Sequence, residues 1–353
     1  MTPSASNRGR GPALSERQAA VLRAVVASYV GEGAPIGSRT LSHLLPVPLS
    51  AASIRNTLGE LTELGLVEKP HASSGRVPTE QGLRRFVDEL MAPGALAASQ
   101  MRELAYQLDQ APGEGVVSRA SELLSQHTRQ LGFVVAPRLE RVVLRHVSVV
   151  RLSSERLLVV LVTETGAAHR RVIEDVHGLS QAELDRIASL LIERVAGHTL
   201  AETRTILIRE ARALRREASA LLVRALELGT RALAGQVGDA DLVIQTRLAL
   251  LDQPEFSDPQ RLKDLFQAIE TKERLLDVLD DVVGAEGVSV GIGDELEDPG
   301  LHHCALVASH YGEGTAGEPL GALGVIGPSR MDFARVIPLV GYLSELVTGK
   351  LRA

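Results

Sequence analysis

Hydrophobic residues recur at helical spacing three times within the first 65 residues, and two short strand patterns follow directly. The first helical run begins after Leu14, the second is the segment RTLSHLL, and the third begins at Ser50. The segments 66–69 and 76–79 can then pair as a hairpin, because PHASSG between them consists mostly of turn residues. Three helices and a hairpin in so short a stretch leave few possible folds.

Polar residues that can cap helices precede these helical runs. Ser15, with the glutamine three residues later, matches a capping box, and Ser38 can cap the second helix. Thr79 can cap a further helix, EQGLRRFVDEL, whose apolar side packs back on the others. We therefore place one folded unit at residues 14–90 and a flexible tail, poor in apolar residues, at residues 1–13.

The third helix has one apolar side and one side of small or polar residues. Spacings of four and three residues put Ile54, Leu58 and Leu61 on the buried side. The other sides then carry Ala52, Ser53, Arg55, Asn56 and Gly59. Small residues let a helix approach a DNA groove closely, and arginine can read guanine while asparagine can read adenine. The pattern predicts a winged helix-turn-helix unit whose third helix enters the major groove.

Two further groups of residues are candidates for contacts with the DNA backbone. Arg76, at the predicted hairpin tip beside Ser74 and Gly75, offers a positive charge to a phosphate without specifying sequence. Arg39 and Thr40, at the start of the second helix, can bind the backbone next to that helix. A winged-helix unit that serves only protein contacts, with these side chains solvated, is the alternative.

The rest of the chain carries both helical and strand patterns after a linker at 92–100. After the strand GFVVAP, three strand patterns separated by the turns SSE and TGA predict an antiparallel meander: LRHVSVVRL, RLLVVLVTE and AHRRVIED. Three more short apolar strands occur near the end: GVSVGIG, CALVASHY and LGALGVIG. Helical patterns occupy most of the remaining segments: 101–109, 116–131, 180–196, 200–233, 258–283 and 331–351.

Composition and charge limit the class of protein. The chain has 353 residues and a net charge of −6, yet residues 1–90 hold 10 Lys and Arg against 8 Asp and Glu, so only this part tolerates a polyanion. No run of about 18 apolar residues and no secretory signal occurs. The single cysteine, Cys304, cannot form an internal disulfide. We expect a cytoplasmic protein of two or three domains that does not reside in a membrane.

Motifs for catalysis, metals and cofactors carry little weight in this sequence. His302, His303 and Cys304 are consecutive, and neighbours on a strand point to opposite faces, so a structural role is favoured over a metal site. No Walker motif occurs, no glycine-rich turn has the order of a dinucleotide site, and no local frame assembles a nucleophile. We expect no enzyme, no cofactor and no metal. The segment IGPSRMDF is expected to pack before the last helix, with a dimer contact by Arg330 or Asp332 as the alternative.

Two long stretches, PIGSRTL and LSAASIRNTLGELTELGLVEKPHASSGRVPTEQGLRRFVDEL, closely resemble the N-terminal domain of the heat-inducible transcription repressor HrcA family. The segment GVIGPSRMDFARVIPLV resembles that family's C-terminal signature. The family's third-helix motif is matched by Ser53, Arg55 and Asn56, and its wing motif by His71, Ser74, Gly75, Arg76 and Thr79. One departure is Leu83, which stands where the family usually has an aromatic residue.

The resemblance implies a homodimeric repressor that binds double-stranded DNA at an inverted-repeat operator upstream of chaperone operons. It also implies that the chaperonin helps to maintain the active repressor. The residues expected to contact DNA are Arg39, Thr40, Ser50, Ala52, Ser53, Arg55, Asn56, His71, Ser74 and Arg76. The resemblance further implies a body similar to GAF domains. A second hypothesis is a ligand-sensing winged-helix regulator, in which a small molecule bound by this body shifts DNA binding.

The expected fold class is α+β with an N-terminal winged helix-turn-helix, and the resemblance implies that a GAF-like α+β domain with an inserted dimerisation domain follows it. The expected division is a tail at 1–13, a winged-helix domain at 14–90, linker helices and the start of the GAF-like domain at 91–140, the inserted domain at 141–230, and the remaining GAF-like domain at 231–353. An alternative places the meander in the GAF-like sheet and only the helices in the insertion.

Overall fold

A computed structural model places most of the chain. The described residues are 12–45, 49–71, 74–92, 94–111, 115–135, 143–164, 168–174, 178–199, 202–203, 205–207, 209, 228–229, 242–244, 250, 253–270, 278–279, 287–313 and 319–352. Nearly all of the expected tail lies outside the described residues, and so does most of the helical stretch expected at 200–233.

The first part of the described chain is a unit of helices and one short hairpin, which we call the head (residues 14–91). In chain order it contains α1 (Glu16–Glu32), α2 (Ser38–Leu44), α3 (Ala51–Glu63), β1 (Val67–Glu68), β2 (Val77–Pro78), α4 (Glu80–Arg85) and the π-helical turn η1 (Phe86–Leu90). The strands β1 and β2 pair antiparallel, which confirms the predicted hairpin. Leu83, at the position of the family's usual aromatic residue, is 2% exposed and belongs to the core.

The predicted helix caps are correct at two positions and wrong at a third. Ser15 N donates to Gln18 Oε1 at 2.9 Å and its hydroxyl accepts from Gln18 N, while the Thr79 hydroxyl accepts from Gly82 N at 3.1 Å. Ser38 is not a cap, because α2 begins one residue earlier than expected and its N-cap is Gly37, which has no side chain to offer. The helix expected at 80–90 also differs, since its second half widens into the π-helical turn η1.

A five-stranded antiparallel sheet forms the centre of the second part, the body (described residues from 94 to 135 and from 242 to 352). Its strand order is β7 (Leu242–Val243), β3 (Leu131–Val135), β10 (Gly321–Pro328), β9 (Cys304–Tyr311) and β8 (Val288–Ile292). One face carries α5 (Ala98–Asp109), α6 (Gly115–Thr128) and α12 (Phe333–Arg352), and the other carries α10 (Pro259–Glu270). The expected α+β class is confirmed.

Alternation along the strands divides the body's apolar residues between two cores. On β3, Val134 faces the core shared with α5, α6 and α12, whereas Phe133 faces the core shared with α10. Three short helical turns complete the body: η5 (Gly293–Leu296) follows β8, while η4 (Pro254–Phe256) and η6 (Pro299–Leu301) contact α10. Because both faces of the sheet are covered by helices, its three central strands, β3, β10 and β9, are buried along most of their length.

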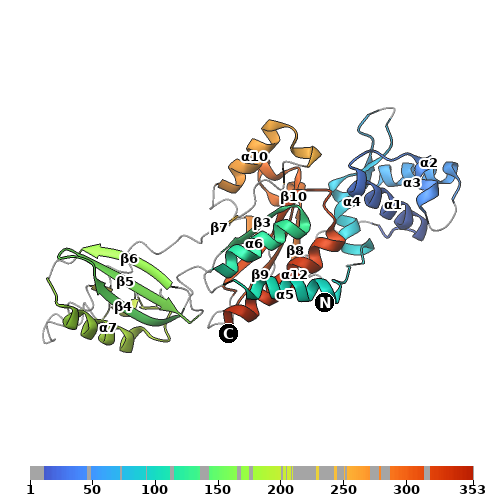
Figure 1. Cartoon of the computed structure of the whole chain (residues 1–353). Helices are drawn as coiled ribbons and strands as arrows, with labels where there is room; N and C mark the ends of the chain where they lie inside the picture. Colours follow the sequence, from blue (N-terminus) through green and yellow to red (C-terminus); the bar gives the residue numbers. More distant parts are fainter. Residues whose placement is uncertain are drawn as a thin grey trace.

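The predicted meander forms a separate sheet. We call this sheet, together with the helix that packs on it, the insert. It contains β4 (Leu144–Arg151), β5 (Arg156–Thr163), β6 (Ala168–Glu174) and α7 (Gln181–Val195). Within the described ranges the three strands pair only with one another, so the alternative that placed them in the main sheet is wrong. In Figure 1 the insert and the head lie at opposite ends of the molecule, with the body between them. The expected domain boundaries near 140 and 230 fall outside the described residues.

Candidate nucleic-acid interface

The two sides of α3 differ in burial as the spacing of its residues predicts. Ile54, Leu58 and Leu61 are 0%, 5% and 0% exposed and anchor the helix in the head core. Ala52, Arg55 and Asn56 are exposed, and Ser53 is half-buried. The apolar side therefore fixes the rotation of α3 and leaves a side with small and hydrogen-bonding residues in solvent.

This exposed side is not covered by the rest of the described chain. Figure 1 shows α2 and α3 on the part of the head that is turned away from the body, while α4 lies on the near part. Arg39 and Thr40 are exposed on the first turn of α2. Side chains of α2 and α3 that can donate hydrogen bonds are thus accessible on the head, and a large polyanion can reach them.

Ser50 and Ser74 are bonded within the protein, so their first role is structural. The Ser50 hydroxyl accepts from Ser53 N at 3.1 Å and caps α3. In the hairpin turn, the Ser74 hydroxyl accepts from His71 N at 2.9 Å and donates to His71 O at 2.7 Å. His71 itself is exposed. Ser50 therefore positions the start of α3, and Ser74 holds the turn that presents His71.

Arg76 does not lie at the hairpin tip as expected. Its backbone pairs with Ile36 in an antiparallel bridge, with N···O distances of 2.8 and 3.0 Å. Arg76 directly precedes β2, so this bridge places Ile36 beside the start of that strand. Gly75 permits this pairing, because a Cβ there would lie 2.3 Å from Ile36 O. The Arg76 Nε also donates to Thr62 Oγ1 of α3 at 3.2 Å. The guanidinium is thereby held against α3 instead of moving freely at a loop tip.

Thr62 is the residue of this surface that sequence reasoning missed. It is exposed, lies seven residues after Arg55, and therefore projects from nearly the same side of α3 about 10 Å further along the helix. The exposed side of α3 carries Arg55 and Asn56 near its N-terminal end. The bond to Thr62 places the Arg76 side chain at the C-terminal end of the same side. The signal was present in the sequence as helical periodicity, but the partner Arg76 comes from another element.

The other candidate sites show no comparable arrangement. Cys304 is buried, and burial raises the pKa of its thiol to about 12, while the exposed His302 has its Nδ1 3.2 Å from Asp294 Oδ1. Among the described residues, no three His, Cys, Asp or Glu side chains gather as a metal site would require. None of the helices in the described ranges has both the length and the hydrophobicity needed to cross a membrane.

A small cavity lies in the insert and not in the body. It has a volume of about 20 Å³ and lies between β4, β5 and α7, lined by apolar side chains and by Thr203. A volume of this size holds about one water molecule. The cavity therefore gives no support to the hypothesis of an effector bound in the body.

Comparison with known proteins identifies the family. A family model described as "HrcA protein C terminal domain" matches residues 114–337. The heat-inducible transcription repressor HrcA of Xanthomonas axonopodis pv. citri is 36% identical over 345 residues, 98% of each chain. That of Geobacter sulfurreducens is 35% identical over 337 residues, 95% of this chain and 97% of the relative. A crystal structure described only as that of a hypothetical protein has a TM-score of 0.62 and 21% identity, covers 96% and 98% of the two chains, and so supports the fold.

These relatives are named as transcription repressors, not as enzymes, and this is the class of protein to which the chain is assigned. Within that class it belongs to the HrcA family, which confirms the resemblance in its sequence motifs.

Proposed function

We propose that this chain represses transcription of heat-inducible chaperone genes by binding an inverted-repeat operator as a homodimer. The observation that carries the proposal is the exposed side of α3, where Ala52, Arg55 and Asn56 lie in solvent on a head element turned away from the body. Such a surface fits the major groove of DNA. The relatives' names, heat-inducible transcription repressors, supply the kind of gene that is regulated.

The head acts in this proposal as a winged helix-turn-helix. Arg55 and Asn56 read base edges, with Ala52 and Ser53 allowing α3 to approach the groove. Arg39, Thr40, His71 and Arg76 bind phosphates on either side, whereas Ser50 and Ser74 hold their segments in place. Base contacts then give specificity and phosphate contacts give affinity.

The insert supplies the dimer contact in this proposal, and the body has the GAF-like fold. One face of the insert sheet packs on α7, but the other face leaves Val150 and Val172 in solvent, 41% and 53% exposed. Exposed apolar residues grouped on a sheet face are typical of a protein–protein contact. A second copy placed there by a two-fold axis gives the symmetry that an inverted repeat requires.

The chaperonin maintains the active repressor in this scheme, so that unfolded proteins that compete for it raise expression of the chaperone genes. The support is family membership alone. Operator binding measured after heat denaturation, with and without added chaperonin, tests this part, because recovery that does not depend on the chaperonin contradicts it.

Binding of the purified protein to a duplex from upstream of the chaperone genes tests the main proposal. Arg55→Ala is expected to weaken operator binding by roughly 1–3 kcal/mol and to change binding to random DNA little. Arg76→Ala is expected to weaken binding to every duplex and to lower the salt slope by about 1. The matched control is Arg102→Ala, which removes an exposed arginine from α5 of the body. Equal losses for Arg55→Ala on operator and random DNA contradict the assignment of base contacts to α3.

A further inference from the structure

The head and the body share one hydrophobic core in addition to the chain linker. A single cluster of buried residues includes Leu83 and Val87 of the head and Ile292 of the body. The linker is also attached to the body, since Gly94 N donates to Ala334 O of α12 at 3.0 Å. The head is therefore packed on the body and is not held by a free tether.

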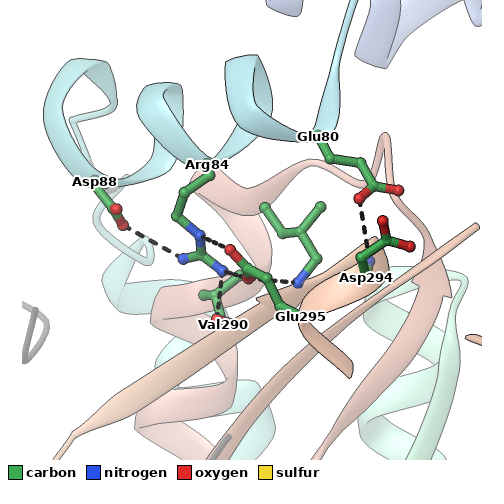
Figure 2. Close-up of polar contacts among 7 residues, drawn as sticks. Glu80, Arg84, Asp88, Val290, Asp294 and Glu295 are labelled. Atoms are coloured by element: carbon green, nitrogen blue, oxygen red, sulfur yellow. Dashed lines mark hydrogen bonds and ion pairs between the residues drawn. The ribbon is translucent and has the colours of Figure 1, made fainter. Parts of the chain in front are cut away.

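Figure 2 shows the first polar contact between the two parts, made by Arg84 of α4. Its Nε donates to Glu295 Oε1 at 2.9 Å, a terminal nitrogen forms an ion pair with the other oxygen of Glu295, and the same nitrogen donates to Val290 O at 2.7 Å. Glu295 also accepts from Ile292 N at 3.0 Å, and Asp88 lies 3.4 Å from the guanidinium. Burial opposes the charge on Arg84, but its bonds with Glu295 and the nearby carboxylates outweigh this and raise the pKa of the guanidinium.

Glu80, one turn earlier on α4, binds the same turn of the body. Its carboxylate accepts from Asp294 N at 3.1 Å, as Figure 2 shows. The preceding residue, Gly293, has a φ of +57°, and a Cβ there would lie 2.0 Å from Oε1 of Glu80. Glycine adopts this backbone conformation without strain and leaves room for the Glu80 carboxylate.

A second contact joins the end of α1 to the turn after β10. Arg330 forms an ion pair with Glu255, and its other nitrogens donate to Val30 O at 3.1 Å and to Gln253 Oε1 at 3.4 Å. The Arg330 and Glu255 side chains are only 12% and 20% exposed. A Cβ at Gly33, whose φ is +66°, would lie 3.2 Å from Arg330 Nε. The Arg330 side chain is thus bonded within the chain.

The two contacts together fix the rotation of the head as well as its position. They hold different elements: Arg84 of α4 pairs with a carboxylate of the body, whereas Arg330, held by Glu255 within the body, donates to the Val30 carbonyl at the end of α1. Tilting the head separates Arg84 from its carboxylate and Arg330 from its carbonyl acceptor, so tilted arrangements are disfavoured. Neither contact uses α2 or the exposed side of α3, which stays accessible in the docked head.

We infer that the Arg84 and Arg330 contacts fix the orientation of the head on the body, so that the state of the body sets the affinity of the dimer for its operator. The inference rests on the proposed function, because two heads of fixed orientation present α3 at one spacing, as a two-fold repeat requires. A released head must be ordered again on binding, which lowers its effective concentration at the second half-site. Movement of β8 or of the turn at Arg330 then weakens operator binding while α3 stays intact.

Paired binding measurements on a whole inverted repeat and on a single half-site test this inference. Arg84→Gln and Arg330→Gln are expected to weaken binding to the whole repeat roughly 10-fold or more and to leave half-site binding unchanged. About 5 additional base pairs between the half-sites place the second site on the opposite side of the duplex. We expect the two variants to bind this lengthened repeat as well as the normal one, whereas the wild type binds it more weakly. The control is Arg119→Gln, which removes an arginine–glutamate pair internal to α6.

Glu295→Gln approaches the first contact from the body and must reproduce the effect of Arg84→Gln. The double variant is expected to lose no more than either single variant, because both remove the same interaction. Folding of each variant is checked by circular dichroism. Whole-repeat affinity equal to that of the wild type in folded Arg84→Gln and Arg330→Gln overturns the inference, and so does an effect of Arg84→Gln that Glu295→Gln lacks.

A distance measurement that needs no DNA separates failure of this inference from failure of the proposed function. Spin labels at Arg23→Cys on α1 and Glu345→Cys on α12 occupy exposed positions, whereas the native Cys304 is buried and has a raised pKa. With labelled chain diluted into unlabelled chain, we expect one narrow head–body distance for the wild type and a broad distribution for Arg84→Gln and Arg330→Gln. Narrow distributions in these variants overturn the inference. A wild type that binds no operator but shows one narrow distance refutes the proposed function and leaves the fixed orientation of the head in place.

Discussion

Cys304 and Tyr311, the first and last residues of β9, are buried with ionisable groups that the candidate interface does not use. Burial raises the pKa of the Cys304 thiol to about 12, and it also raises the pKa of the Tyr311 hydroxyl, which donates to Val135 O at 2.8 Å. A group that stays protonated in the fold favours unfolding once the pH exceeds its pKa in the unfolded chain. The body sheet is therefore expected to be sensitive to alkali.

The contribution of Cys304 to the loss of stability at alkaline pH can be measured by substitution. Because the unfolded thiol loses its proton near pH 9 and the folded thiol near pH 12, the contribution of Cys304 is complete below pH 9 and is lost as the pH rises through this window. Between pH 7.5 and 10.5 the free energy of unfolding of the wild type should fall by about 2 kcal/mol more than that of Cys304→Ala. Urea unfolding at both pH values provides the measurement, and parallel losses in the two proteins would refute the account.

At single residues, the sequence predicts burial better than it predicts partners. The exposure of Arg55 and Asn56 follows from local periodicity, because Ile54 on the buried side fixes the rotation of α3. The position of Arg76 does not follow, because its partners Ile36 and Thr62 belong to other elements. Their bonds depend on packing that no local pattern encodes.

At the scale of elements, the types of most described helices and strands follow from hydrophobic periodicity, but their ends depend on competing caps. Ser15 and Ser38 precede similar helical patterns, yet only Ser15 has a glutamine three residues later that completes a capping box. Before α2, Gly37 takes the N-cap conformation itself, which moves Ser38 into the first turn. Serine before a helix is therefore not sufficient to identify a cap.

Substitution of the two serines should distinguish these roles. Ser15→Ala removes the hydroxyl that accepts from Gln18 N and is expected to destabilise α1 by about 1 kcal/mol. Ser38→Ala removes no capping bond and is expected to change stability by less than about 0.5 kcal/mol. Hydrogen exchange of the α1 and α2 amides measures both effects in the intact chain, and a loss for Ser38→Ala as large as that for Ser15→Ala would contradict the assignment of the caps.

At the scale of the whole molecule, strand patterns do not reveal which sheet a strand joins. Among the strands that the structure describes, β4, β5 and β6 of the meander pair only with one another, while β3 just before them pairs with β10 near the end of the chain. The bond from Arg84 to Glu295 likewise joins residues 211 positions apart. Such long-range pairing depends on how residues far apart in the sequence pack together in the cores of the body and the insert. Local strand patterns do not contain this information, which is why the sequence left two positions open for the meander.

The outer face of the insert sheet leads to a prediction about assembly. Cross-strand register places Val150 opposite Leu158, and Leu158 opposite Val172, so the three form one apolar row across the sheet. If a second copy covers this row, Val172→Asp buries an unpaired carboxylate in the contact, which should weaken the dimer at least about tenfold and weaken operator binding with it. Sedimentation velocity over a range of concentrations measures the dissociation constant of the dimer.

Tyr106→Asp provides the control, since Tyr106 is 63% exposed on α5 of the body. A Val172→Asp protein that remains as dimeric as Tyr106→Asp would show that the two copies associate through another surface.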